Sequence, residues 1–174
     1  MTIQIRRLDR VDERQLAELA GVLIDCVAGG ASVSFLHPLS PAKADAFWRG
    51  VAAGVARGER ALLIAEDDAG AIVGTVQVLL NQPENQPHRG DIAKMLVHRR
   101  ARRLGLGARL LAAAEAAALA AGKTLLVLDT VSGSDGDRLY ARHGWQALGR
   151  IENYALWPDG QPCAATIFFK HLAP

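Results

Sequence analysis

The chain has 174 residues, of which 50% are hydrophobic and 22% are charged, and its formal net charge at pH 7 is +2. This length suits one domain with its own core, and so small a charge gives no argument for nucleic acid or a membrane as a partner. No apolar run reaches the roughly 20 residues of a membrane span. Cys26 and Cys163 lie far apart in the sequence and are interpreted as free thiols. We therefore expect a soluble, cytoplasmic protein.

The first third of the chain predicts one strand and two helices. Residues 3–5 alternate apolar and polar side chains, which indicates a short strand. Either Asp9 or Asp12 can cap the next helix, in which leucines recur every three or four residues. A second helix begins after Ser40, because a proline at the first helical position follows this capping residue, and it ends at Gly58.

The middle of the chain predicts a hairpin and a further strand. Residues 61–66 and 71–80 are rich in aliphatic side chains and flank a turn, which is typical of two antiparallel strands. Gly74 within the second of them indicates a bulge. A polar loop at 81–90 then leads to a central strand at 91–97.

The last part alternates helices and strands. A helix at 108–121 connects the central strand to the apolar run 125–129, which is typical of a strand buried on both faces. The remaining predicted elements are a short helix from Ser134 or Asp135 to Gly144 and two strands at 145–154 and 164–171. Only the connection through 108–121 fits a parallel crossover. We therefore expect a single α/β domain with a mixed, mostly antiparallel sheet of about seven strands flanked by helices.

The segment from 91 to 108 predicts an anion-binding site. The strand leads into a cluster of arginines, and Gly105 and Gly107 follow just before the helix. Glycines let backbone N–H groups approach a ligand, a helix N-terminus favours phosphate, and Arg102 and Arg103 add charged donors. The spacing fits neither a P-loop nor a dinucleotide fingerprint, and no nucleic-acid motif accompanies it.

Arg102-x-x-Gly105-x-Gly107, preceded by Met-Leu-Val at 95–97, resembles the acetyl-CoA signature of the GCN5-related N-acetyltransferase (GNAT) superfamily. The order of predicted elements resembles that family along nearly the whole chain. The resemblance implies an acetyl-CoA-dependent N-acetyltransferase whose fourth and fifth strands are splayed, with the pantetheine arm between them. The residues it implies for acetyl-CoA binding are Met95, Leu96, Val97, Arg102, Arg103, Leu104, Gly105, Leu106, Gly107, Ala108 and Tyr140.

A narrower resemblance points to the acceptor. The stretches 29–35, 128–130 and 158–170 resemble the tabtoxin-resistance acetyltransferases, which acetylate the amine of a β-lactam toxin. This implies a small amine as substrate, with Ser32, Phe35, Trp48 and Asp129 around it. Two alternatives stay open: a peptide or protein N-terminus as acceptor, and a non-catalytic module that only binds acyl-CoA. Whether the protein is a monomer or a homodimer also stays open.

Acetylation of an amine needs a base for the ammonium and an acid for the leaving thiolate. Asp129, at the end of the fifth predicted strand, is the first candidate base, and it matches a candidate in the tabtoxin-resistance type. Asp91 is the alternative, because histone-acetylating relatives carry a glutamate there. Tyr140, in a segment that resembles the family's Leu-Tyr motif, suits the acid, since its unperturbed pKa is near ~10.

Two further features complete the predicted chemistry. A backbone N–H within 95–97 would hold the oxyanion of the tetrahedral intermediate. The five histidines show no metal-binding spacing, so we expect no metal.

Overall fold

The computed structural model describes residues 2–173, which form one seven-stranded sheet with helices on both faces. The elements are β1 (Gln4–Leu8), α1 (Glu13–Ala28), α2 (Pro41–Ala56), β2 (Arg60–Glu66), β3 (Ile72–Leu79), β4 (Arg89–Val97), the 3-10 turn η1 (Arg99–Ala101), α3 (Leu106–Ala120), β5 (Leu125–Val131), α4 (Asp135–Arg142), β6 (Gln146–Leu156) and β7 (Pro162–His171). The strand order is β1-β2-β3-β4-β5-β7-β6, and only β4 and β5 pair in parallel. The predicted mixed, mostly antiparallel sheet is confirmed.

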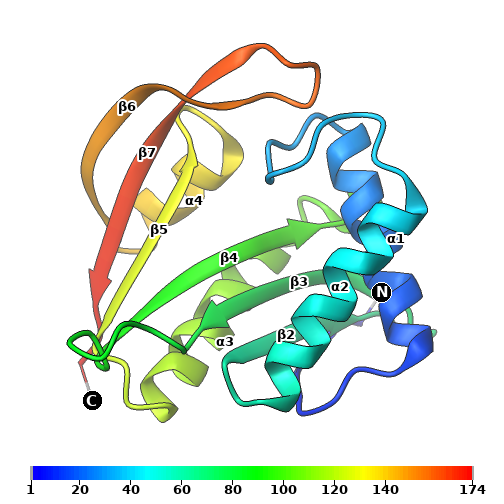
Figure 1. Ribbon diagram of the computed structural model, residues 1–174, viewed down its shortest axis with the longest axis horizontal. Helices are drawn as coiled ribbons and strands as arrows, with labels where there is room; N and C mark the ends of the chain where they lie inside the picture. Colours follow the sequence, from blue (N-terminus) through cyan, green and yellow to red (C-terminus); the bar gives the residue numbers. More distant parts are fainter. Residues whose placement is uncertain (1, 174) are drawn as a thin grey trace.

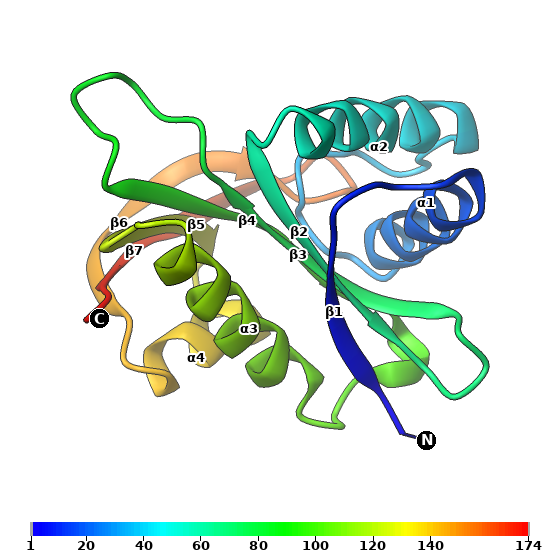
Figure 2. The same ribbon diagram turned by 90° about the horizontal axis from the view of Figure 1, so that it is seen from below.

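The helices cover the sheet in two layers (Figure 2), with α1 and α2 on one face and α3 and α4 on the other. Under α1 and α2 lies a core that includes Leu19, Leu23 and Trp48, each fully buried. On the other face, Leu110 of α3 belongs to a second core that includes Phe168 of β7. Among residues 2–173, no helix is long and apolar enough to cross a membrane.

Side-chain caps fix where the helices start. The Asp12 carboxylate accepts a hydrogen bond from the Gln15 N–H at 2.8 Å, and Gln15 Oε1 accepts one from the Asp12 N–H at 2.9 Å. This reciprocal capping box selects Asp12 over Asp9 as the cap of α1. Ser40 caps α2 and Ser134 caps α4 through their hydroxyls.

The two parallel strands separate after a short contact. β4 and β5 pair only from Arg89 opposite Leu125 to Asp91 opposite Val127. Beyond this point β4 follows β3 and β5 follows β7, and Figure 1 shows the two strands spreading apart. The expected splay of the fourth and fifth strands is therefore present, and it opens the sheet at its centre.

A bulge marks β4 on its side of the opening. Leu96 lies opposite Thr75 and Ala93 lies opposite Gln77, so two residues of β4 face one residue of β3. The first of the two, Lys94, has a left-handed φ of +51°. The bulge turns this part of β4 relative to the regular pleat. A second register shift lies beside Gly74, as expected.

Candidate active site

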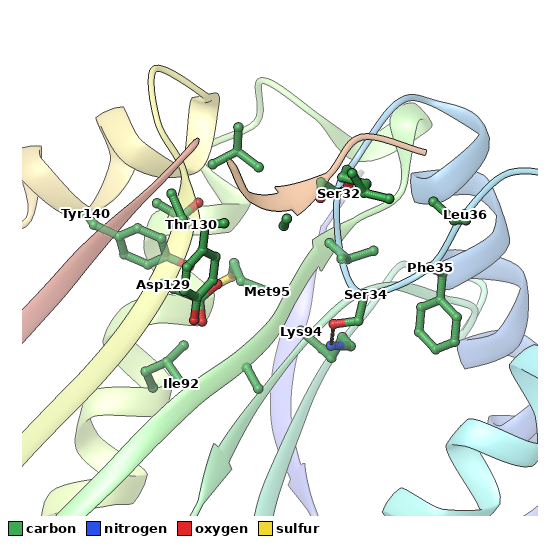
Figure 3. Close-up of a pocket in the computed structure, with 17 residues that line it drawn as sticks. Ser32, Ser34, Phe35, Leu36, Ile92, Lys94, Met95, Asp129, Thr130 and Tyr140 are labelled. Carbon is green, nitrogen blue, oxygen red and sulfur yellow. Dashed lines mark hydrogen bonds between the residues drawn. The ribbon is translucent and has the colours of Figure 1, made fainter. Parts of the chain in front are cut away.

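A cavity of about 530 Å³ lies in the opening between β4 and β5 (Figure 3), and we call it the cleft cavity. Its walls come from residues 32–36, from β4, from the end of β5 and from Tyr140 and β6. Its two charged side chains are Lys94 of β4 and Asp129 of β5. The cavity thus presents a cation and a carboxylate from the two strands that separate.

Asp129 follows the apolar core of β5, where it is exposed to the cavity. Its preceding neighbour Leu128 is buried, because alternate residues of a strand point to opposite faces. No side chain among residues 2–173 donates a hydrogen bond to the Asp129 carboxylate. Its oxygens are therefore available to a ligand.

Tyr140 is held firmly by α4, and only 5% of its surface is exposed. Its ring packs against Trp145 at 5.7 Å and Phe168 at 5.9 Å between ring centroids. Burial raises the pKa of the Tyr140 hydroxyl, and the negative charge of Asp129 raises it further. The phenol is therefore protonated at neutral pH and can act as a proton donor.

A second concavity, of about 950 Å³, lies between the start of α3 and α4, and we call it the glycine–arginine groove. Gly105 precedes α3 with a φ of +70°, and no side chain caps this helix. The N–H groups of its first turn are therefore left for a ligand. Gly107 allows α3 to pack closely against Leu139 of α4, since a Cβ at this position would lie 3.3 Å from Leu139 Cδ2.

The groove is rich in positive charge. Arginines from η1, the loop after it and the end of α4 line it, namely Arg99, Arg102, Arg103 and Arg142. Arg99 is already paired with Asp25, at 2.8 Å between Nε and Oδ1. Arg102 donates from Nε to the Val97 carbonyl at 3.1 Å, which fixes its side chain beside the groove. Uncapped amides and guanidinium groups together fit a diphosphate such as that of coenzyme A.

The groove and the cleft cavity share a wall. Six residues line both, namely Ser32, Val33, Met95, Thr130, Val131 and Tyr140. A long ligand whose phosphates lie at the start of α3 can therefore reach the cavity with its other end. The shared position of Tyr140 places its ring at this junction.

Most of the residues predicted to hold acetyl-CoA line the groove. They are Met95, Leu96, Val97, Arg102, Arg103, Gly105, Leu106, Gly107, Ala108 and Tyr140. Leu104 is the exception: it does not line the groove, and it is 53% exposed. The positive φ values of its neighbours, Arg103 at +63° and Gly105 at +70°, turn the chain sharply around it.

Two of the other predicted site residues lie away from the cavity. Trp48 was expected beside the acceptor, but it is fully buried under α2, with its ring 5.1 Å from Phe47. Asp91 lies outside the cavity, where β4 and β5 are still paired, and its carboxylate accepts hydrogen bonds from Arg89 and from Gln82. The expected acceptor-site residues Ser32 and Phe35 do line the cavity, as Asp129 does.

Sequence reasoning missed Lys94 and Tyr154, which also line the cavity. One signal was present: Lys94 is a charged residue inside an otherwise apolar central strand. Tyr154 stands in the last hairpin, where only the folded chain brings it to the site. In the described part of the chain, no three His, Cys, Asp or Glu side chains gather as a metal site would require.

A seven-stranded sheet that opens between two parallel strands, beside an uncapped helix N-terminus, is an α/β fold with a site suited to a phosphate-bearing ligand. The family model described as the acetyltransferase (GNAT) family matches residues 21–145. The chain belongs to this family, and it is an acyltransferase.

Solved structures with the same fold include other acetyltransferases. One is an acetyltransferase of the GNAT family from Streptococcus pneumoniae, with 23% identity, a TM-score of 0.79 and coverage of 98% of this chain and 100% of that one. Another is a GNAT superfamily phosphinothricin acetyltransferase from Sinorhizobium meliloti in complex with acetyl-CoA, with 16% identity, a TM-score of 0.80 and coverage of 99% and 90%. A third is a ribosomal-protein-alanine N-acetyltransferase from Brucella melitensis, with 20% identity, a TM-score of 0.79 and coverage of 97% and 99%.

Proposed function

We propose that this protein transfers the acetyl group of acetyl-CoA to the primary amine of a small, amino-acid-like molecule. The observation that carries the proposal is the junction of the glycine–arginine groove with the cleft cavity: Tyr140 lines both, and Asp129 lines the cavity. The similarity to a phosphinothricin acetyltransferase with bound acetyl-CoA supports both the donor and the small acceptor.

The groove residues bind and orient the donor. Acetyl-CoA, when bound, supplies an activated acetyl thioester. The first-turn amides of α3 and the guanidinium groups of Arg102 and Arg103 hold the phosphates. Met95 and Val97 would border the pantetheine arm, and a backbone N–H of β4 would donate to the acetyl carbonyl oxygen. Tyr140 lines both concavities, so its hydroxyl would lie near the thioester.

Asp129 serves as the base in this proposal. An amine can attack only after its ammonium form has lost a proton, and a carboxylate in contact with it, directly or through water, can accept that proton. The Asp129 carboxylate faces the cavity, and among residues 2–173 no hydrogen-bond donor contacts it. Asp91 is engaged by Arg89 and Gln82 away from the cavity, which argues against it as the base.

Tyr140 serves as the acid. When the C–S bond breaks, the sulfur carries the electron pair as a thiolate, which must be protonated to leave as a thiol. Tyr140 reaches the junction from α4 and retains its proton at neutral pH, because its pKa is raised by burial and by Asp129. It can therefore give that proton to the sulfur.

A peptide N-terminus is the second candidate acceptor. Three exposed apolar residues border the cleft cavity, Leu36 at 50%, Tyr154 at 47% and Leu156 at 45% exposure. Such a rim can contact a chain longer than one amino acid. The similarity to a ribosomal-protein-alanine N-acetyltransferase supports this alternative.

A thiol-release assay with acetyl-CoA distinguishes these possibilities. The acceptor panel contains free amino acids, phosphinothricin, β-lactam amino acids and a short peptide with a free N-terminus. We expect turnover above the hydrolysis background with one or more of the small amines. Turnover with the peptide alone would select the second candidate. Acetyl-CoA binding without turnover of any amine would contradict catalysis and leave the acyl-CoA-binding module.

A further inference from the structure

Lys94 is placed in the cleft cavity by the bulge of β4. With its φ of +51°, the bulge breaks the alternation of this strand, and the side chain lines the cavity. Figure 3 shows Lys94 beside Ser34, with Asp129 on the other side of the cavity. This lysine has no part in the proton transfers proposed for Asp129 and Tyr140.

In the described part of the chain, the Lys94 ammonium group contacts only neutral partners. Nζ donates to Ser34 Oγ at 3.0 Å and lies 5.5 Å from the centroid of the Phe47 ring. Within residues 2–173, no carboxylate approaches it to salt-bridge distance, and the nearby guanidinium of Arg60 adds a second positive charge. Asp129 acts on Lys94 only as a more distant negative charge.

Lys170 shows how the same fold treats another partly buried lysine. Its Nζ lies 2.7 Å from Glu115 Oε2 and also donates to the His143 carbonyl. Lys94 is partly buried as well, but none of residues 2–173 gives it such a counter-charge. A desolvated cation is costly unless an anion compensates it. The open space beside Lys94 is the cleft cavity itself.

We propose that Lys94 binds an anionic group of the acceptor, so that the enzyme selects amines that also carry a carboxylate or a similar anion. This inference rests on the proposed function. The acceptor's ammonium lies toward Asp129 on β5, and its anion lies toward Lys94 on β4. The cavity then matches a zwitterion, with opposite charges presented from the two separated strands. Ser34 holds the lysine in place, since its hydroxyl accepts from Nζ.

The test compares an amino acid with its own amide, so that only the anion changes. L-methionine with L-methioninamide, and L-glutamine with L-glutaminamide, give two such pairs, and the best amino acid of the acceptor panel gives a third. The quantity measured is the ratio of kcat/KM for the acid to kcat/KM for the amide. Differences in amine basicity cancel when this ratio is compared between protein variants.

Three variants test the role of the charge. Lys94→Met keeps the length and loses the charge, and we expect the acid-to-amide ratio to fall by about 10-fold or more, mainly through KM of the acid. Lys94→Arg keeps the charge and should retain part of the preference. Lys43→Met is the matched control, because Lys43 is exposed and lies near the Phe35 ring, at 5.8 Å, without lining the cavity. Its ratio should equal that of the wild type.

Two results would overturn the inference. One is an acid-to-amide ratio that is unchanged in Lys94→Met. The other is an equal fall in kcat for acid and amide with loss of the acid limb of the pH–rate profile, which would make Lys94 a base. An acetyl-CoA-induced rise in Tm in each variant shows that the fold and the groove are intact.

A binding measurement separates this inference from the proposed function. If the wild type releases no thiol with any amine, the proposed function fails. The proposed anion site at Lys94 can then still be tested by the rise in Tm that L-methionine causes in the presence of coenzyme A. Stabilisation of the wild type but not of Lys94→Met supports the anion site, and equal effects on both proteins contradict it.

Discussion

The negative charge of Asp129 adds to burial in raising the pKa of the Tyr140 hydroxyl, so the proposed base and the proposed acid are electrostatically coupled. This coupling favours the protonation state of Tyr140 that each step of the reaction requires. While Asp129 is ionised, Tyr140 keeps its proton. Once Asp129 has accepted a proton from the amine, its charge is gone and Tyr140 becomes the stronger acid. This is also the moment when the departing sulfur needs a proton.

Replacing Asp129 with Asn should lower turnover by roughly 10²–10⁴, because the amide keeps the size but cannot accept the proton. The Tm shift on adding acetyl-CoA should persist, since Asp129 does not line the glycine–arginine groove. Asp91→Asn is the matched control and should keep its turnover. Steady-state thiol release measures both variants. Full turnover in Asp129→Asn with loss of turnover in Asp91→Asn would instead identify Asp91 as the base.

Replacing Tyr140 with Phe should slow thiol release and flatten the alkaline limb of the pH–rate profile. Because the pKa of Tyr140 is raised, the wild-type alkaline limb should lie above the ordinary tyrosine value of about 10. In Asp129→Asn the limb should move to lower pH, since one of the two causes of the raised pKa is removed. Phe keeps the contacts with Trp145 and Phe168, so Tm should change little. An alkaline limb that is unaltered in both Tyr140→Phe and Asp129→Asn would contradict the assignment of Tyr140 as the acid.

Local signals in the sequence were enough for most of the fold. Capping residues, turn glycines and apolar periodicity located the helices and strands, and the run from Arg102 to Gly107 located the groove. These features depend on neighbours in the chain. The predicted ends were less accurate: β1 extends to Leu8 because pairing with Leu62 of β2 continues the strand.

Side-chain direction and long-range pairing could not be predicted from the sequence. Trp48 and Phe47 are adjacent on α2, and only the packing of the helix on the sheet decides that Trp48 is fully buried. Asp91 is excluded from the cavity by where β4 and β5 stop pairing, which depends on residues more than 30 positions apart. The bulge that brings Lys94 into the cavity depends on pairing with β3. None of these can be decided from neighbouring residues.

Replacing Gly105 with Val should weaken or abolish the Tm shift caused by acetyl-CoA. A β-branched residue is strained at a φ of +70°, so the loop that presents the first-turn amides of α3 must change shape. Gly122→Val is the matched control at the other end of α3, where φ is +76° and no other atom crowds the site. It should lose comparable stability but keep the acetyl-CoA shift. Equal shifts in both variants would contradict the role of the groove.

Replacing Arg102 with Ala should weaken coenzyme A binding by about 1.5–3 kcal/mol if its guanidinium contacts phosphate directly. Arg103→Ala tests the neighbouring charge in the same way. Isothermal titration with coenzyme A and dephospho-coenzyme A separates the two phosphate sites, because a contact with the 3′-phosphate affects only the former. Arg100→Ala is the control, since Arg100 pairs with Asp67 at 2.6 Å and does not line the groove. Unchanged affinity in both groove variants would contradict phosphate binding.

Replacing Gly74 with Ala should destabilise the fold by about 1–3 kcal/mol, because α3 crosses β3 too closely for a side chain. A Cβ at Gly74 would lie 3.1 Å from Leu110 Cδ1 and 3.1 Å from the Leu96 carbonyl oxygen. The leucine can rotate, but the carbonyl belongs to β4 and can move only with the strand. Gly50→Ala, in α2 with nothing within 4 Å of its Cβ position, should instead stabilise by about 0.5–1 kcal/mol through helix propensity. Urea unfolding measures both, and a Gly74→Ala variant as stable as the wild type would show that β3 and α3 are not in this tight contact.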